Sequence, residues 1–123
     1  MPNRPDFNRA DRIRKAMIRE FSDILMRNIK EPRMNDVLIS VTDAEVSGDL
    51  RHVRLFVSIR GDEATQNEIM EILEEQTPKI RTELGHRIRL RHTPEVVIKL
   101  DTSMERGARV THLLNQISRG EDI

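Results

Sequence analysis

The clearest hydrophobic pattern of the chain lies between residues 62 and 94, where apolar residues recur at nearly helical spacing. They are Ile69, Leu73, Ile80, Leu84 and Ile88. Pro78 interrupts this stripe, and because proline lacks the N–H that would bond to the carbonyl of Glu74, the helix is expected to bend or restart there. Thr77 is a natural N-cap before the proline, so we predict a helix, a kink at Gln76, Thr77 and Pro78, and a second helix.

A second stripe of the same period predicts a helix near the start of the chain. It begins at Asp6 or Asn8, either of which can accept bonds from the first-turn N–H groups, and runs to about Lys30. Pro32 ends it, because the residue before a proline disfavours helical dihedral angles. Its buried face is expected to hold Ala10, Ile13, Met17, Phe21, Ile24 and Leu25.

Two stretches of alternating β-branched and polar residues predict an antiparallel hairpin. The first covers residues 37–46 and the second residues 52–59, with turn residues at 47–49 between them. The inward positions are Val37, Ile39 and Val41 in the first strand and Val53, Leu55, Val57 and Ile59 in the second. Phe56 falls on the outer register beside Arg54, where it either packs under a helix or meets a partner.

Pro94 opens a third predicted strand, residues 95–101, because proline is tolerated at the first position of a strand. Its inward residues are Val96, Ile98 and Leu100. Asp101 or Ser103 then caps a last short helix, which Gly120 stops. The apolar positions of that helix are Val110, Leu113, Leu114 and Ile117.

These elements together predict an α+β fold in which helices cover one side of a three-stranded sheet. At 123 residues the chain forms one domain, residues 1–123, with residues 119–123 frayed at the end. Gly85 inside the kinked helix pair costs about 1 kcal/mol relative to alanine unless close packing explains it. We therefore interpret Gly85 as a point where two helices approach closely.

The composition excludes several kinds of chemistry. There is no cysteine, which rules out disulfides and thiolate sites, and the five glycines are scattered singly, which rules out a glycine-rich phosphate loop. The histidines show no metal-ligand spacing with one another or with carboxylates: His52, His86, His92 and His112. No catalytic constellation, cofactor or metal is expected, and without a signal peptide or an apolar membrane span the expected location is the cytoplasm.

The net charge is zero, with 21 basic and 21 acidic residues, but the two signs are separated along the chain. Residues 62–77 contain six acids and no lysine or arginine, whereas residues 78–92 contain five such cations and one acid. In the first predicted helix four cations fall within about 120° of one another and share one face. They are Arg9, Arg12, Lys15 and Arg19. Such a face either binds a polyanion or only keeps the helix solvated.

The residue types favour one way of binding nucleic acid. Arginine outnumbers lysine by 17 to 4, which suits bidentate contacts with phosphate. Aromatic residues are limited to three phenylalanines, which excludes a sheet surface that stacks bases. Recognition would therefore use backbone charge and shape, and five to eight phosphate contacts would give a log-affinity slope against log salt of about −4 to −7.

Four stretches of the chain stand out together: Glu31-Pro32-Arg33, VTDAEVSGDL at 41–50, LGHRIRLRHTPEV at 84–96, and Asp101-Thr102-Ser103 followed by Gly107. In this order and with this spacing, they resemble the bacterial ribosome-binding factor A family. The resemblance implies a single type II KH-like domain that binds the small (30S) ribosomal subunit or its precursor and assists late maturation of its rRNA, without being an enzyme.

The same resemblance also implies a kink between two helices. In this family a helix-kink-helix replaces the GxxG loop of KH domains, often with an Ala-x-Gly triplet at the kink. Here the triplet aligns with Gln76-Thr77-Pro78, so proline rather than glycine sets the bend. We expect the bend to be stiffer for that reason.

The leading hypothesis is a non-catalytic assembly factor whose partners are the small ribosomal subunit, its rRNA and ribosomal proteins, with no membrane contact and a monomeric free state. The candidate RNA-binding residues are Arg9, Arg12, Lys15, Arg19, Lys79, Arg81, Arg87, Arg89 and Arg91. The alternative is a protein-interaction adaptor whose acidic helix, Glu68 to Glu75, docks a basic partner while the cations only solubilise the chain.

Overall fold

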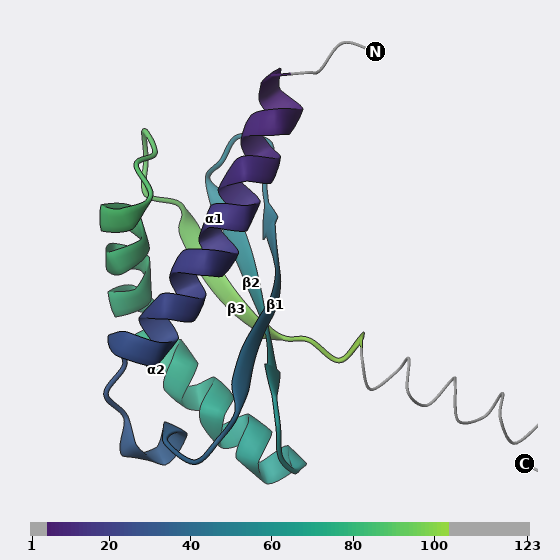
Figure 1. Ribbon diagram of the computed structural model, residues 1–123, viewed down its shortest axis with the longest axis vertical. Helices are drawn as coiled ribbons and strands as arrows, with labels where there is room; N and C mark the ends of the chain where they lie inside the picture. Colours follow the sequence, from purple (N-terminus) through teal and green to yellow (C-terminus); the bar gives the residue numbers. More distant parts are fainter. Residues whose placement is uncertain (1–4, 104–123) are drawn as a thin grey trace, which may run out of the picture.

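The structure, a computed structural model, describes residues 5–103, with side chains from residue 9 onward. Its elements in chain order are α1 (Pro5–Arg27), the 3-10 helix η1 (Pro32–Met34), β1 (Ile39–Val46), β2 (His52–Ile59), α2 (Glu63–Arg87) and β3 (Glu95–Leu100) (Figure 1). The predicted last helix, capped by Asp101 or Ser103, lies outside the described residues. None of the described helices is both long enough and apolar enough to cross a membrane.

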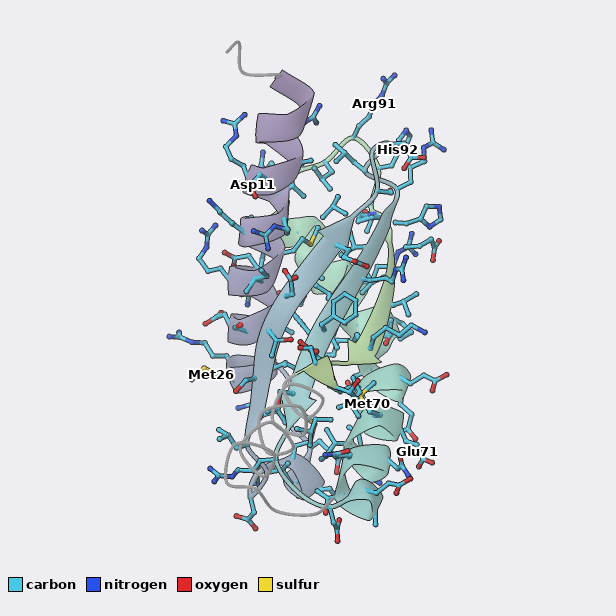
Figure 2. The ribbon with its side chains drawn as sticks, turned by 90° about the vertical axis from the view of Figure 1, so that its right-hand side faces the viewer. Asp11, Met26, Met70, Glu71, Arg91 and His92 are labelled. Carbon is cyan, nitrogen blue, oxygen red and sulfur yellow. The ribbon has the colours of Figure 1, made fainter. Side chains whose placement is uncertain are left out.

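Within the described part of the chain, three strands form one sheet in the order β1-β2-β3. The strands β1 and β2 are antiparallel, and β3 is parallel to β2, so α2 serves as the crossover between them. Both helices lie against the same face of this sheet, as Figures 1 and 2 show. The predicted α+β fold with helices on one side is therefore confirmed.

The core lies between the helices and the inner face of the sheet. It contains Met17, Phe21 and Ile24 of α1, each fully buried, together with the alternate residues of β2. The inward positions predicted for β2 are all buried: Val53, Leu55, Val57 and Ile59. Phe56 lies half-buried on the opposite face, so the prediction that it packs under a helix is wrong for the helices described.

The first helix is confirmed but ends earlier than predicted. It stops at Arg27, because the N–H groups of Asn28 and Ile29 both bond to the carbonyl of Ile24 and close its last turn. Pro32 therefore does not end the helix. It opens η1 instead, where the Glu31 side chain caps the first turn by accepting from the Arg33 N–H.

β1 contains a β-bulge that the alternating pattern did not predict. Val41 pairs with Val57 and Asp43 pairs with Phe56, so Thr42 is the additional residue. The bulge reverses the facing of the later residues of the strand, which puts Ala44 in the core, whereas strict alternation would have put Asp43 there. Val37, Ile39 and Val41 were predicted to point inward from the first strand, and all three pack against the core.

α2 runs without interruption from Glu63 to Arg87, with Pro78 inside it. The predicted restart with Thr77 as N-cap is wrong, because the Thr77 hydroxyl donates to the carbonyl of Leu73 at 2.8 Å, a contact typical of a helix interior. Leu73 and Ile80 are fully buried on either side of the proline, so packing holds both turns in place. The helix thus tolerates the missing N–H.

Candidate nucleic-acid interface

The outer face of α1 carries the first group of predicted RNA-binding residues, and all of them are exposed: Arg9, Arg12, Lys15 and Arg19. Lys15 forms an ion pair with Asp11 at 3.2 Å, and this contact holds the pKa of Asp11 below its ordinary value. Arg19 pairs with Glu20 at 3.0 Å. The other two cations form no ion pair with any described residue, which leaves them free to meet an anion.

A second group of cations gathers at the end of the molecule where α1 starts. There a cavity of about 430 Å³, here called the basic hollow, is lined by Arg9, Asp49, Leu50, Arg51, Leu90, Arg91 and His92. These residues come from α1, from the β1–β2 turn and from the loop between α2 and β3. Cations from segments far apart in the sequence therefore surround one depression, with leucines between them.

The β1–β2 turn fixes one wall of the basic hollow. The Ser47 N–H donates to the carbonyl of His52, and the Leu50 N–H donates to the carbonyl of Ser47, both at 2.9 Å. Leu50 adopts a φ of +62°, an uncommon value for a non-glycine residue. Asp49 accepts from the Ser47 hydroxyl and from the Arg51 N–H, and the Ser47 bond is the main reason its pKa lies below the ordinary value. This acid thus stabilises the turn.

The loop from residue 88 to 94 forms the facing wall and is tied to α2. The Arg81 guanidinium donates to the carbonyl of Pro94 at 2.8 Å and to that of Thr93 at 3.1 Å. Gly85 lies directly under the loop, since a Cβ there would stand 3.1 Å from the Thr93 hydroxyl oxygen. The close approach predicted at Gly85 is therefore an approach to this loop, and the prediction of a helix–helix contact is wrong.

Besides Arg81, two further predicted cations of α2 form hydrogen bonds within the protein. The Arg87 side chain is only 23% exposed and donates to the side chains of Glu20, Asp23, Glu83 and Asn28. Its strongest contact is with Asp23 at 2.6 Å, which raises the pKa of Arg87 and lowers that of Asp23. Lys79 donates to the carbonyl of Asn28 at 2.8 Å. These groups hold the end of α1 against α2.

Arg89 and Arg91 differ from these, because both are exposed in the loop after α2. Figure 2 shows Arg91 and His92 at one end of the molecule and Glu71 toward the other. The segment of α2 that carries the acids, residues 63–77, therefore lies away from the basic hollow. The zero net charge does not reveal that the acids of α2 lie apart from the cations of the basic hollow.

Arg51 and His92 line the basic hollow but were not among the predicted site residues. Arg51 stands among residues of mixed charge and His92 is neutral in its ordinary form, and only the pairing of β2 with β3 brings the turn before β2 beside the loop before β3. Among the described residues no group of histidine, aspartate and glutamate side chains is arranged to hold a metal ion.

A family model described as ribosome-binding factor A matches residues 9–114. The chain belongs to the ribosome-binding factor A family. Ribosome-binding factor A of Rippkaea orientalis is 50% identical over 109 residues, which cover 89% of this chain and 85% of that protein. The factor of Gloeobacter violaceus is 48% identical over 116 residues, which cover 94% of this chain and 90% of that protein.

Solved structures share the fold. The crystal structure of ribosome-binding factor A from Thermus thermophilus matches with a TM-score of 0.63 at 16% identity, covering 74% of this chain and 94% of that one. A Thermotoga maritima protein solved by NMR in solution matches with a TM-score of 0.69 at 24% identity, covering 85% and 96%. A homology model of the Thermus thermophilus factor, fitted into the cryo-EM map of a complex of that factor with 30S, matches with a TM-score of 0.55 at 17% identity, covering 76% and 92%.

Proposed function

We propose that this chain is a non-catalytic assembly factor that binds the free small (30S) ribosomal subunit or its precursor and assists late maturation and processing of its rRNA. Membership in the ribosome-binding factor A family supports this function, as does the fold shared with a factor fitted into a map of a 30S complex. The chain acts as one domain, residues 1–123, in the cytoplasm and as a monomer when free.

The basic hollow is the observation that carries the proposal. Arg9, Arg51, Arg91 and His92 surround it, and the exposed cations of α1 continue from it along the helix. A phosphate backbone is recognised by such an array of guanidinium groups, since each can donate two hydrogen bonds to one phosphate. Leu50 and Leu90, which also line the hollow, add apolar surface for a sugar or base.

The candidate residues of the sequence divide into two roles in this proposal. Arg9, Arg12, Lys15, Arg19, Arg89 and Arg91 contact phosphate, because they are exposed. Lys79, Arg81 and Arg87 position the surface, because their donors are bonded to backbone or carboxylate groups of the protein. Arg51 joins the first group.

The domain is of the type II KH-like class, with α2 as its kinked helix pair and Gln76, Thr77 and Pro78 at the kink. The parallel pair β2 and β3 joined by α2 supports this assignment. Pro78 removes the bond that would reach the carbonyl of Glu74, and the ribbon of α2 in Figure 1 takes different directions on the two sides of its middle.

A double variant in which two cations of the basic hollow are replaced by acids tests the proposed function. Replacing Arg51 and Arg91 by glutamate should lower the affinity for purified small subunits at least about tenfold and reduce the salt slope of binding by about 1.5 to 2, since two phosphate contacts are lost. Co-sedimentation measured between low and high salt supplies both quantities. The fold should persist, because both side chains are exposed.

In the matched control, Lys30 and Arg60 are replaced by glutamate. Both residues are also exposed, and the change in net charge is the same. If the two double variants lose binding equally, general charge rather than the basic hollow explains the affinity. If neither loses binding, the proposed surface is wrong.

A further inference from the structure

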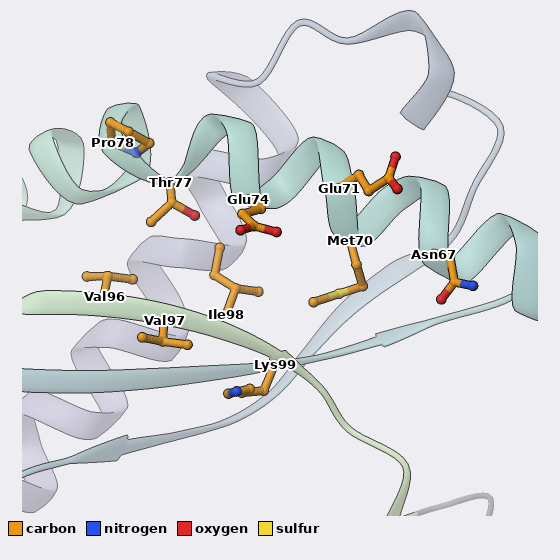
Figure 3. Close-up of a pocket in the computed structure, with 10 residues that line it drawn as sticks. All are labelled: Asn67, Met70, Glu71, Glu74, Thr77, Pro78, Val96, Val97, Ile98 and Lys99. Carbon is orange, nitrogen blue, oxygen red and sulfur yellow. The ribbon is translucent and has the colours of Figure 1, made fainter.

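A second depression lies apart from the basic hollow and shares no lining residue with it. It runs between α2 and β3, has a volume of about 740 Å³, and is lined by Asn67, Met70, Glu71, Glu74, Thr77, Pro78, Val96, Val97, Ile98 and Lys99. Figure 3 shows Met70 of α2 and Ile98 of β3 extending into the space between the two elements. We call it the α2–β3 groove. Its floor is largely apolar.

One wall of this groove is an open sheet edge. The Glu95 N–H donates to the carbonyl of Arg51 and the Asp101 N–H to that of Val57, so odd-numbered residues of β3 bond to β2. Successive residues of a strand point their backbone groups to opposite sides, which directs those of Val96, Ile98 and Leu100 away from β2. No described strand pairs with them. A row of donors and acceptors therefore borders the groove.

The other wall is acidic. Glu71 and Glu74 line it, both exposed, and residues 62–77 carry six acids with no lysine or arginine. Figure 3 shows the Glu74 carboxylate on the side of α2 that faces β3. Lys99 is the cation among the lining residues, and its side chain projects to the opposite side of β3 from Ile98. A polyanion is repelled here, whereas a cation is attracted.

We propose that the α2–β3 groove binds an extended, basic polypeptide segment of a partner protein, which adds to the edge of β3 as a further strand. Main-chain hydrogen bonds to Val96, Ile98 and Leu100 supply the affinity in this mode of recognition. Alternate side chains of the added strand point toward α2, where lysine or arginine meets Glu71 and Glu74 and the aliphatic stems pack on Met70. The groove thus accepts alternating cationic and apolar residues.

The open edge of β3 is better suited to this addition than the outer edge of β1. β1 contains the bulge at Thr42, which disrupts a ladder and discourages further pairing. The described β3 pairs with β2 in regular register from Glu95 to Leu100. In addition, Val97 leaves 46% of its surface exposed on the outer face of β3, where the second set of side chains of an added strand would lie.

The test uses the full chain labelled with nitrogen-15 and the peptide KVKVKVKV as the probe. On binding, the amides of Val96, Ile98 and Leu100 should shift and become protected from hydrogen exchange. The same peptide with an N-methyl group on every residue keeps its charge but has no backbone N–H to donate to β3, so it should bind at least about tenfold more weakly. Equal binding of the two peptides would overturn the proposal.

Protein variants test the acidic wall. Reversing Glu71 and Glu74 to lysine should weaken peptide binding at least about tenfold, whereas reversing Glu63 and Glu68, exposed on the same helix but outside the lining, should change it by less than about threefold. An equal loss of peptide affinity in both variants would mean that the overall charge of the protein explains the binding, and it would overturn the proposed site.

Two further outcomes also overturn it. One is protection of the Val96, Ile98 and Leu100 amides in the free full-length chain, which would mean that the chain covers its own edge. The other is a single-stranded RNA oligonucleotide shifting these amides in place of the peptide. The variant with Arg51 and Arg91 reversed should bind the peptide like the natural chain, so a failure of the RNA surface and a failure of the α2–β3 groove are distinguishable.

Discussion

Arg87 shows how one residue can unite the helical layer. Its guanidinium contacts Asp23 and Glu20 of α1 and Glu83 of α2, with only 23% of its side chain exposed. Partly buried charges are stabilising when several hydrogen bonds compensate their loss of water, and Arg87 has such bonds on each nitrogen. The residue is therefore better placed to join α1 to α2 than to reach phosphate.

This contact predicts a specific pH dependence of stability. Arg87 is the main reason that the folded-state pKa of Asp23 is lowered, so the carboxylate stabilises the fold above the ordinary aspartate pKa, near 4, and this stabilisation is lost as the pH falls through the lowered value. The free energy of unfolding of Asp23→Asn should therefore lie below that of the natural chain at pH 7, and the difference should shrink below about pH 4.

Urea unfolding at a series of pH values measures the difference. Asp36→Asn is the control, because Asp36 is exposed and forms no ion pair with a described residue. A difference for Asp23→Asn that stays constant from pH 7 to pH 3 would show that the charge of Asp23 is not what stabilises the contact.

At the scale of elements, α2 combines one continuous helix with an internal proline. The Asp62 side chain caps its start by accepting from the Thr65 N–H at 2.8 Å, which lowers the pKa of Asp62. The buried residues Leu73 and Ile80 then hold the turns on both sides of Pro78 against the core. Tertiary packing thus maintains a helix that the local sequence would interrupt.

Replacing Pro78 by alanine should stabilise the protein. Alanine restores a donor for the carbonyl of Glu74 and removes a penalty of about 3 kcal/mol for proline in a helix interior. Alanine also makes the unfolded chain more flexible, which lowers the free energy of unfolding by about 1 kcal/mol. We expect the free energy of unfolding to rise by about 1–2 kcal/mol in urea denaturation. The control Pro32→Ala should show no such rise, because Pro32 stands at the start of η1, where the helix needs no backbone N–H donor.

A decrease in stability for Pro78→Ala would reverse the interpretation. It would mean that the geometry imposed by proline is needed for Leu73 and Ile80 to be buried together. The affinity of the same variant for small subunits reports whether the bend itself contributes to binding.

At the scale of the molecule, the basic hollow and the acidic segment of α2 offer two different surfaces. The basic hollow and the outer face of α1 lie apart from the acidic half of α2 (Figure 2). An assembly factor between RNA and protein could use both surfaces at once, since neither obstructs the other. Ionic strength should affect the first surface most, because phosphate binding releases condensed counterions.

Reversing the exposed cations of α1 tests the larger surface. The variant with Arg12, Lys15 and Arg19 replaced by glutamate should lose salt-sensitive co-sedimentation with small subunits and should lower the salt slope by about 2 to 3. Its circular dichroism spectrum should stay unchanged, because all three side chains are exposed. Unchanged co-sedimentation would remove this face from the proposed interface.

The sequence by itself determined the order of α1, the three strands and the helical segment between β2 and β3, because periods of 2 and 3.6 residues follow from local backbone geometry. It also determined which residues of β2 are buried and which end of α2 is acidic. It did not predict η1 or the continuity of α2 across Pro78. Local patterns could not show the bulge at Thr42, since a bulge depends on the partner strand.

Only the tertiary structure decided which cations face solvent and which stabilise the fold. Arg87 and Arg91 look equivalent in the sequence, yet one is bonded to carboxylates more than 60 positions away and the other lines the basic hollow. The physical reason is that a charge acquires its role from neighbours in space. The pairing of β3 beside β2 brings those neighbours together, and it leaves the edge of β3 open beside the acids of α2.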